Sequence, residues 1–338
     1  MRRAPDMVTL LTEDDVRASV TYAGLYAVIE DSLRRWHTRG VGHRPRSRLS
    51  TGATSLHVLA GADAGAGYVG VKAYGAHGRG HDHVVLLYRD SDGGLDAIVA
   101  AGALGVLRTG VASAVATRHM HGDTRVLGIV GSGNLATSHA LAIAANSPRI
   151  GEIRVHSRDQ ANRERCAAGI EAELTAGTCT VRAVSSVAEA CEGADVVCTT
   201  TTAHRPVLDS ADVGHAAHVN AAGSNGLARV EVSAAVVARS RVVVDSREQA
   251  RNEAGDLLAL VESGRLDWQQ LPELGEVVSG SRTPLPVGGS SSAEKPDLTL
   301  FESLGIGLFD VTAAAHALSV ARTHGLGTET GLGGEGGS

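Results

Sequence analysis

The sequence predicts an α/β protein in which a doubly wound parallel sheet accompanies an α+β region. A glycine-rich turn lies between an apolar run and an expected helix near the middle of the 338-residue chain. After this turn, strand-like apolar runs alternate with helical segments, which is the pattern of a parallel sheet with crossover helices. Before it, several strand-like runs follow one another, as expected for a largely antiparallel sheet.

The glycine-rich turn has the sequence GSGNLA and follows the apolar run Val126–Val130. It matches the fingerprint G-x-G-x-x-G/A of Rossmann-type dinucleotide-binding sheets. Gly131 allows the turn, Gly133 lets backbone N–H groups approach a pyrophosphate, and Ala136 keeps the helix close to the sheet. The helix N-terminus adds partial positive charge. The motif therefore predicts a dinucleotide site.

The segment after the fingerprint supplies further helices and strands. Helices are expected over 159–176, Ser186–Cys191 and, after a polar Pro/Gly/Ser loop at 279–297, Phe309–Thr323. The expected strands are Glu152–His156, Val181–Val184, Ala194–Thr200, His218–Ala222, Arg241–Asp245 and the strand-like TLFESLG that precedes the last helix.

The residues before the fingerprint predict the α+β region. Apolar positions on one face predict a helix over Tyr22–Trp36, after a shorter one over Glu13–Ser19. The GG pair at 93–94 signals a hairpin, and a helix over Thr109–Met120 joins this region to the nucleotide-binding sheet. The expected strands are Arg46–Leu49, Ser55–Leu59, Tyr68–Tyr74, His83–Tyr88 and Asp96–Ala101.

Composition and charge narrow the possible partners and location. The net charge of −6 gives no reason to expect nucleic acid or an anionic membrane as partner. No apolar run approaches the roughly 20 residues of a membrane span, and the first residues lack the apolar region of a signal peptide. The four cysteines have no CxxC spacing, which favours reduced, structural thiols and a cytoplasmic protein.

Two basic residues are candidate ligands of a substrate carboxylate. Arg108 precedes an expected helix with Thr109 as its N-cap, where a cation becomes favourable if an anion lies between it and the free N–H groups. The alternative is an arginine paired with a surface acid. Lys72 lies on a strand, where it either faces solvent or enters a cleft as a carboxylate ligand or proton donor. The same alternatives apply to Arg46 and Arg48.

The stretch GAHGRGHDH raises the possibility of a metal site. It contains His77, His81, Asp82 and His83, but without the regular spacing that would preorganise metal ligands. A loop or substrate lid is therefore favoured, and no metal is expected.

The ends of two expected strands bear on the cofactor. A sheet that selects NAD usually has an acid after its second strand to bind the ribose hydroxyls, but this chain has Ser157 and Arg158 there. Both could bind a 2′-phosphate, which favours NADP while leaving NAD possible. Asp159 is expected to cap the next helix. Asn225 follows a later strand and is expected near the nicotinamide or substrate, unless it is only a turn residue.

Five segments occur in a characteristic order along nearly the whole chain. They are 107–117 (LRTGVASAVAT), the fingerprint at 126–136, 218–225 (HVNAAGSN) with Glu231, 244–250 (VDSREQA) with 253–256 (EAGD), and 301–305 (FESLG) with Asp310. Together they make the sequence similar to the ornithine cyclodeaminase/μ-crystallin family.

The resemblance implies a Rossmann domain beside a substrate-binding and dimerisation domain built from both chain ends. It also implies a homodimer and NAD(P)-dependent hydride transfer at the Cα–N bond of amino acids or their imines. We expect the substrate-binding domain over 1–118, completed by 305–326, and the Rossmann domain over 119–304. A disordered tail is expected over 327–338.

The resemblance also suggests roles for individual residues. By position, Lys72 and Arg108 match the family lysine and arginine that hold the substrate carboxylate, and Arg46 matches a further arginine. Asn225 departs from the cyclodeaminases, which carry an aspartate there. An amide cannot transfer a proton as a carboxylate can, so this departure favours imine reduction over ornithine cyclisation.

We therefore expect an NAD(P)-dependent imine or ketimine reductase acting on a small imino acid, or the reverse amino acid dehydrogenase. The alternatives are an ornithine- or lysine-type cyclodeaminase with NAD, and a non-catalytic NADPH-dependent binding protein like the crystallin relatives. Lys72 is the expected proton donor, and Asn225 lies beside the reacting groups. The expected cofactor-binding residues are Thr109, Gly131, Ser132, Gly133, Asn134, Leu135, Ser157, Arg158, Thr200, Asn225 and Ser303.

Overall fold

The computed structural model describes residues 7–76, 82–175, 177, 179–214, 217–287 and 297–331. The chain forms two compact units, one of residues 1–108 and 306–338 and one of residues 109–305. The division falls between Arg108 and Thr109, inside a helix, rather than after residue 118. Residues of this helix beyond Arg108 belong to the second unit through contacts such as that of Ser113 Oγ with His139 Nε2, at 3.0 Å.

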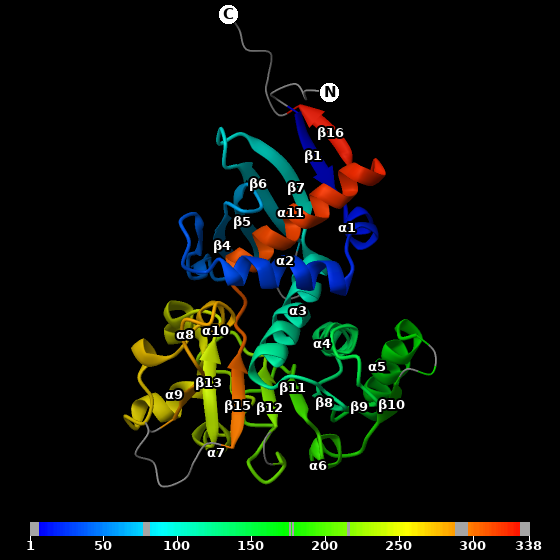
Figure 1. Ribbon diagram of the computed structural model, residues 1–338, viewed down its shortest axis with the longest axis vertical. Helices are drawn as coiled ribbons and strands as arrows, with labels where there is room; N and C mark the ends of the chain where they lie inside the picture. Colours follow the sequence, from blue (N-terminus) through cyan, green and yellow to red (C-terminus); the bar gives the residue numbers. More distant parts are fainter. Residues whose placement is uncertain are drawn as a thin grey trace, which may run out of the picture. The chain divides into compact units, whose positions relative to one another are not determined.

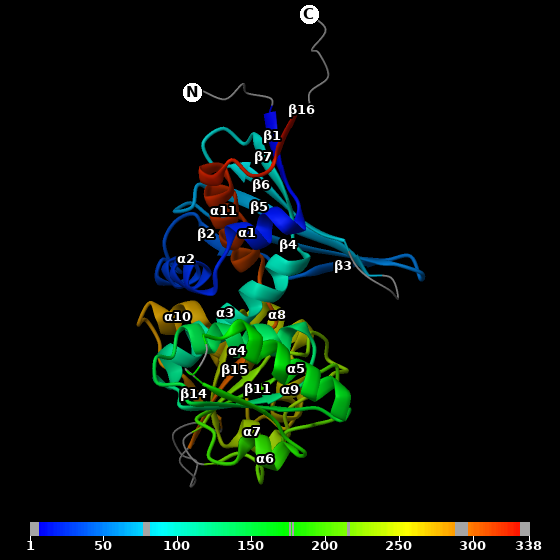
Figure 2. The ribbon, with the colours of Figure 1, turned by 90° about the vertical axis from the view of Figure 1, so that its right-hand side faces the viewer.

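The first unit is a largely antiparallel sheet with helices on one face. Its strand order is β16-β1-β7-β6-β5-β4-β2, with β3 on β4, and β1 pairs with β7 in parallel. Figure 2 shows α1, α2 and α11 on one side of this sheet. Its elements are β1 (Met7–Leu11), α1 (Glu13–Ser19), α2 (Tyr22–Arg34), β2 (Val41–His43), β3 (Ser47–Ser50), β4 (Ser55–Asp63), β5 (Tyr68–Ala76), β6 (His83–Arg89), β7 (Leu95–Ala100), α11 (Gly307–His324) and β16 (Thr328–Gly331).

Helix α11 packs closely on the sheet because two glycines meet. A Cβ atom at Gly61 on β4 would lie 2.4 Å from the backbone of Gly307 at the start of α11. Any larger residue would therefore push the helix off the strand. This approach fixes the first turns of α11 against β4 and β5, and Asp310 lies in those turns.

Strand β16 corrects the expectation of a disordered tail over 327–338. Thr328 pairs with Leu10, and Gly331 pairs with Met7. The polar sequence TETG carries no strand signal of its own, but β1 offers an edge of unpaired backbone groups that it satisfies. Residues 332–338 lie outside the described part of the chain. The short strands β1, β2 and β14 (Leu285–Pro286) are likewise absent from the sequence-based expectation.

Helix α3 (Gly102–Met120) also begins earlier than expected. The Glu13 carboxylate accepts hydrogen bonds from the backbone N–H groups of Gly102 and Ala103, at 2.7 and 2.8 Å, and so caps the helix from α1. The prediction that Thr109 is the N-cap is wrong, and the helix N-terminus does not lie next to Arg108. The start of α3 has no polar capping residue of its own, so its position depends on a distant acid.

The second unit is the doubly wound parallel sheet that the sequence predicts (Figure 1). Its strand order is β10-β9-β8-β11-β12-β15-β13-β14, and its strand pairs are parallel apart from the β13–β14 pair. Its elements are β8 (Val126–Val130), α4 (Asn134–Ala145), β9 (Glu152–His156), α5 (Gln160–Glu173), β10 (Thr180–Ala183), α6 (Val187–Cys191), β11 (Val196–Thr199), β12 (His218–Ala221), α7 (Ala234–Ala238), β13 (Ser240–Val244), α8 (Arg247–Glu253), α9 (Gly255–Glu262), η1 (Trp268–Gln270), α10 (Leu274–Val278), β14 and β15 (Leu298–Glu302).

The order of the strands sets the position of the ligand crevice. From β8 the chain proceeds outward to β9 and β10, then returns to β11 on the other side of β8. Right-handed crossovers therefore place the connecting helices on opposite faces of the sheet. Ligands of such sheets bind where the order reverses, outside the carboxyl ends of the strands. In this unit that point lies between β8 and β11.

Candidate active site

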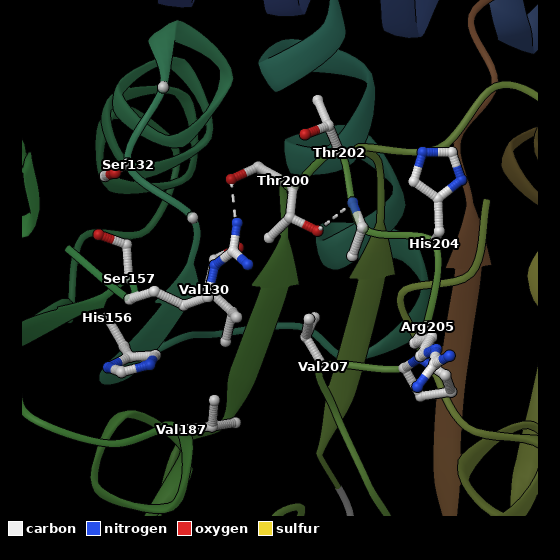
Figure 3. A pocket seen from close by; sticks show the side chains of 16 residues that line it. Val130, Ser132, His156, Ser157, Val187, Thr200, Thr202, His204, Arg205 and Val207 are labelled. Atoms are coloured by element: carbon white, nitrogen blue, oxygen red, sulfur yellow. Dashed lines mark hydrogen bonds between the residues drawn. The ribbon is translucent and has the colours of Figure 1, made fainter.

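A pocket of about 800 Å³ lies at this reversal point. Val130 at the end of β8 pairs with Thr199 at the end of β11, so the loops that follow both strands start side by side. Figure 3 shows Ser132, Ser157 and Thr200 on one side of the pocket and His204 and Arg205 on the other. Six of the expected cofactor residues line it: Gly131, Ser132, Gly133, Ser157, Arg158 and Thr200.

The structure explains the two fingerprint glycines in different ways. Gly131 has φ +133°, and a Cβ atom there would lie 2.4 Å from Thr200 Oγ1, so glycine is required by the backbone and by packing. At Gly133, the N-cap residue of α4, a Cβ atom would meet no heavy atom within 4 Å. The open space before this helix N-terminus fits an approaching pyrophosphate. Asn134 and Leu135 belong to the first turn of α4, where backbone N–H groups lack intrahelical partners.

The pocket lining includes several basic side chains. Asp159 caps α5 by accepting a hydrogen bond from Asn162 N–H at 2.7 Å, which confirms its expected capping role. Arg158 is exposed at the pocket lining. Two further basic residues, His204 and Arg205, line the same pocket and are missed by sequence reasoning. They follow β11, so the rule that ligands bind at carboxyl ends of strands could have indicated them.

The other expected cofactor residues do not line this pocket. Ser303 follows β15, donates its N–H to Ala221 O at 2.8 Å, and has a buried Oγ without a hydrogen-bond partner in the described part of the chain. Asn225 is exposed in the loop after β12. Thr109 is buried within α3.

A buried acid supports the pocket loops. Glu231 accepts hydrogen bonds from the backbone N–H of Thr201, from Thr201 Oγ1 at 2.7 Å and from Gly223 N–H at 2.7 Å. Asp256 accepts hydrogen bonds from the N–H groups of Glu231 and Val232. Burial raises the pKa of Glu231 to about 7 and that of Asp256 to about 6. These contacts fix the loop after β11, and sequence reasoning assigned them no role.

The first unit contains a buried cluster of charged side chains. Lys72 on β5 and Arg108 on α3 are each 5% exposed, and both contact Asp310 on α11. Arg108 Nε donates to Asp310 Oδ1 at 2.8 Å, and Lys72 Nζ donates to the same oxygen at 3.2 Å. Arg108 Nη1 is buried without a hydrogen-bond partner among the described residues. A buried, unpartnered guanidinium nitrogen is suited to binding an anion.

The charges in this cluster affect one another. Burial lowers the pKa of Lys72, Asp310 raises it, and Arg108 and Arg46 lower it further. Arg46, which precedes β3, therefore contributes to the field at Lys72. Asp310 has no role in the sequence-based expectation. Its signal is a carboxylate within the otherwise apolar run GLFDVTAAA at the start of α11.

The histidine-rich stretch adds no metal ligands to the described structure. His77 and His81 lie outside the described residues. The His83 ring packs on Tyr74 with centroids 4.5 Å apart, and Tyr74 stacks on His57 at 4.6 Å. The described ranges contain no group of three or more His, Cys, Asp or Glu side chains that could hold a metal ion.

The doubly wound sheet with its glycine fingerprint defines a dinucleotide-binding protein, here joined to a unit with a buried cationic cluster. The family model of the ornithine cyclodeaminase/mu-crystallin family matches residues 7–322. The chain belongs to this family. Within the described residues, no helix is long and apolar enough to cross a membrane.

Individual relatives support this assignment. The chain is 35% identical to ketimine reductase mu-crystallin of Rattus norvegicus over 235 residues, 69% of this chain and 68% of the relative. It is 30% identical to Delta(1)-pyrroline-2-carboxylate reductase of Bacillus cereus over 247 residues, 72% of each chain. The solved structure of Thermococcus litoralis Delta(1)-pyrroline-2-carboxylate reductase, in complex with NADH and L-proline, matches with TM-score 0.85 at 23% identity. That match covers 95% of this chain and 99% of the other, and it shows the fold alone.

Proposed function

We propose that the protein is an NAD(P)-dependent oxidoreductase that reduces the C=N bond of a small imino acid to give an amino acid. The observation that carries the proposal is the buried Lys72–Arg108 pair, whose unpartnered Arg108 Nη1 is suited to a substrate carboxylate. The fingerprint pocket supplies the dinucleotide site. Ketimine and pyrroline-2-carboxylate reductases among the relatives act on substrates of this class.

The residues then have definite tasks. Arg108 and Lys72 bind the carboxylate, with Arg46 adding positive charge, and this fixes the position of the adjacent imine carbon. A nicotinamide cofactor held by the fingerprint pocket would supply the hydride. Lys72 is the proton donor to the imine nitrogen, so one hydride and one proton convert the imine to the amine. Asn225 has an amide where proton transfer in a cyclodeaminase would need a carboxylate, so we propose reduction rather than cyclisation.

The pocket supports a preference for NADP. Arg158 and Arg205 place two cations on its lining, and no acid follows β9 directly to bind the ribose hydroxyls. A 2′-phosphate would gain charge-assisted hydrogen bonds from these guanidinium groups. NADPH is therefore the proposed cofactor, with NADH as the weaker substitute.

We also propose a homodimer that works in the cytoplasm. Among the described residues of the first unit, three large apolar side chains are exposed: Leu49 on β3, Leu56 on β4 and Val69 on β5. Leu49 and Leu56 are direct cross-strand partners, and Val69 lies on the same face, opposite to Lys72. Contact between the faces of two copies would bury these three side chains. The molar mass measured by sedimentation tests whether the protein is a dimer.

The function is tested by following NADPH and NADH oxidation with Δ1-pyrroline-2-carboxylate, and with 2-oxo acids plus ammonia or methylamine. Lys72→Ala and Arg108→Ala are expected to lower kcat/KM about 100-fold, because each removes a charged hydrogen bond to the substrate. Arg89→Ala removes a partly buried cation from β6, paired with Asp92 and Asp96, and serves as the control. Full turnover in the Lys72 and Arg108 variants would contradict the assignment.

Two outcomes would favour the other functions. Formation of proline and ammonia from L-ornithine would indicate a cyclodeaminase. Tight NADPH binding without turnover of any imino acid in the panel would indicate a binding protein.

A further inference from the structure

Asp310 lies between the two basic residues proposed to bind the substrate. Its Oδ1 accepts hydrogen bonds from both Arg108 Nε and Lys72 Nζ, at 2.8 and 3.2 Å. Its Oδ2 accepts a longer one from Arg108 Nη2, at 3.4 Å. The three side chains come from α11, α3 and β5, so the contact joins three elements of the first unit.

A carboxylate at this position requires an explanation. Asp310 is fully buried, and its neighbours on α11 are buried as well, among them Phe309 and Val311. Burying an ionised carboxylate costs several kcal/mol unless it is paired and hydrogen-bonded. Although burial opposes ionisation, Arg108 and Lys72 together lower the pKa of Asp310. The acid is therefore retained as a charged partner of these two cations.

The cluster has more positive than negative charge. Asp310 neutralises one of the two cations, and Arg108 Nη1 has no partner within the described residues. Lys72 is confined as well, because a Cβ atom at Gly105 on α3 would lie 2.6 Å from its Nζ. The arrangement thus leaves one positive charge, on a fixed ammonium and guanidinium pair, for one further anion.

We propose that Asp310 is a positioning residue that holds Lys72 and Arg108 together and keeps Lys72 in the ammonium form needed to bind and protonate the substrate. This inference rests on the proposed function of the Lys72–Arg108 pair. In this proposal Asp310 acts through the two cations, because its Oδ1 accepts hydrogen bonds from both and its Oδ2 accepts one from Arg108.

The surroundings of Lys72 explain why the ammonium form depends on Asp310. Among the described residues, the charged and titratable groups that act on it are Asp310 on α11, Arg108 on α3 and Arg46 before β3, and the centroid of the Tyr74 ring is 5.9 Å from Nζ. Burial and the two arginines lower the pKa of Lys72, and Asp310 opposes them. Removing the Asp310 charge must therefore lower the pKa of Lys72.

A direct titration of Lys72 tests the proposal without relying on activity. The chain contains two lysines, Lys72 and Lys295, so protein labelled with [6-¹³C]lysine gives two NMR signals, which a Lys295→Arg variant assigns. In the Asp310→Asn variant we expect the Lys72 pKa to fall by at least about 1 unit, since an opposite charge at this distance shifts a pKa by about 1–3 units. An unchanged Lys72 pKa would overturn the proposal.

A matched control exists in the same unit. Asp63 is also fully buried, and it accepts hydrogen bonds from Arg35 at 2.9 Å and from Thr312 of α11 at 2.8 Å. Asp63→Asn removes a comparable buried charge away from Lys72 and should leave the Lys72 titration unchanged. If Asp310→Asn does not fold, wild-type protein decides: a Lys72 pKa below about 7 would show that Asp310 does not keep it charged.

The pH profile separates this inference from the proposed function. In Asp310→Asn, the alkaline fall of kcat/KM for Δ1-pyrroline-2-carboxylate should move to lower pH by the same amount as the Lys72 pKa, while Asp63→Asn keeps the wild-type profile. An unmoved profile beside a lowered Lys72 pKa would contradict the link to catalysis. Absence of turnover in wild-type protein would overturn the proposed function, and the NMR titration would still decide the role of Asp310.

Discussion

A neutral residue at position 231 should remove a pH-dependent loss of stability from the second unit. Glu231 is buried, and burial raises the pKa of its carboxyl to about 7 from an ordinary value of 4.5. The folded state therefore holds this proton more tightly than the unfolded state does. Between pH 4.5 and about pH 7 the folded state binds more protons than the unfolded state. The free energy of unfolding therefore falls as pH rises through this range.

The structure gives the size of the effect. A pKa difference of this size corresponds to about 3 kcal/mol, at about 1.4 kcal/mol per unit. The side chain at position 231 of the Glu231→Gln variant cannot ionise, so the variant does not lose this stability as pH rises. The variant also presents an amide N–H₂ where Gly223 N–H needs an acceptor, which costs about 1–3 kcal/mol at every pH. As pH rises, the free energy of unfolding of the variant should therefore increase by about 3 kcal/mol relative to that of the parent.

Tryptophan fluorescence can isolate the second unit. The chain has two tryptophans, Trp36 in the first unit and Trp268 in the second, so a Trp36→Phe background reports on the unit that contains Glu231. Urea unfolding is measured at about pH 4 and about pH 8, on either side of the titration. Asp256 is present in both proteins, so its own titration cancels to first order. A stability difference that is the same at both pH values would refute the reasoning. The control is Glu248→Gln, which changes an exposed carboxylate.

Three further predictions concern the cofactor pocket. Arg158→Ala should weaken NADPH binding about 10–100-fold with little effect on NADH, because it removes a charged hydrogen bond to the 2′-phosphate; equal losses for both cofactors in isothermal titration calorimetry would contradict the NADP preference. Gly131→Ala should lower the unfolding temperature, because its φ of +133° and the 2.4 Å approach to Thr200 Oγ1 admit no Cβ atom. Position 133 has open space around it, so Gly133→Ala should keep the unfolding temperature and lose only cofactor affinity. Loss of stability in this variant would contradict the assignment of that space to the pyrophosphate.

The elements with strong local signals could be predicted from the sequence. The fingerprint strand Val126–Val130 and the strand Glu152–His156 have the same bounds in the structure. The first is a continuous apolar run and the second alternates apolar and polar residues, and both patterns are visible without any partner. Asp159 as a helix cap is equally local, because a cap satisfies N–H groups only a few residues away.

The elements that were not predicted correctly depend on contacts with residues far away in the sequence. The start of α3 is set by Glu13, which lies far away in the sequence. Strand β16 has no apolar pattern and forms because β1 provides an edge for it. Neither partner can be found from local periodicity, because the hydrogen bonds that define these elements join the two ends of a long stretch of chain.

By itself, the sequence determined the doubly wound sheet, its dinucleotide fingerprint, the absence of an acid after the second strand, and the identity of Lys72 and Arg108 as candidate carboxylate ligands. These are properties of local pattern and of the residue types present. Only the tertiary structure decided that Asp310 joins Lys72 and Arg108, that Arg205 shares a pocket with Arg158, and that Glu231 holds the loop after β11. The physical reason is that burial and the approach of distant charges set the protonation and orientation of these groups, and both arise only when the chain is folded.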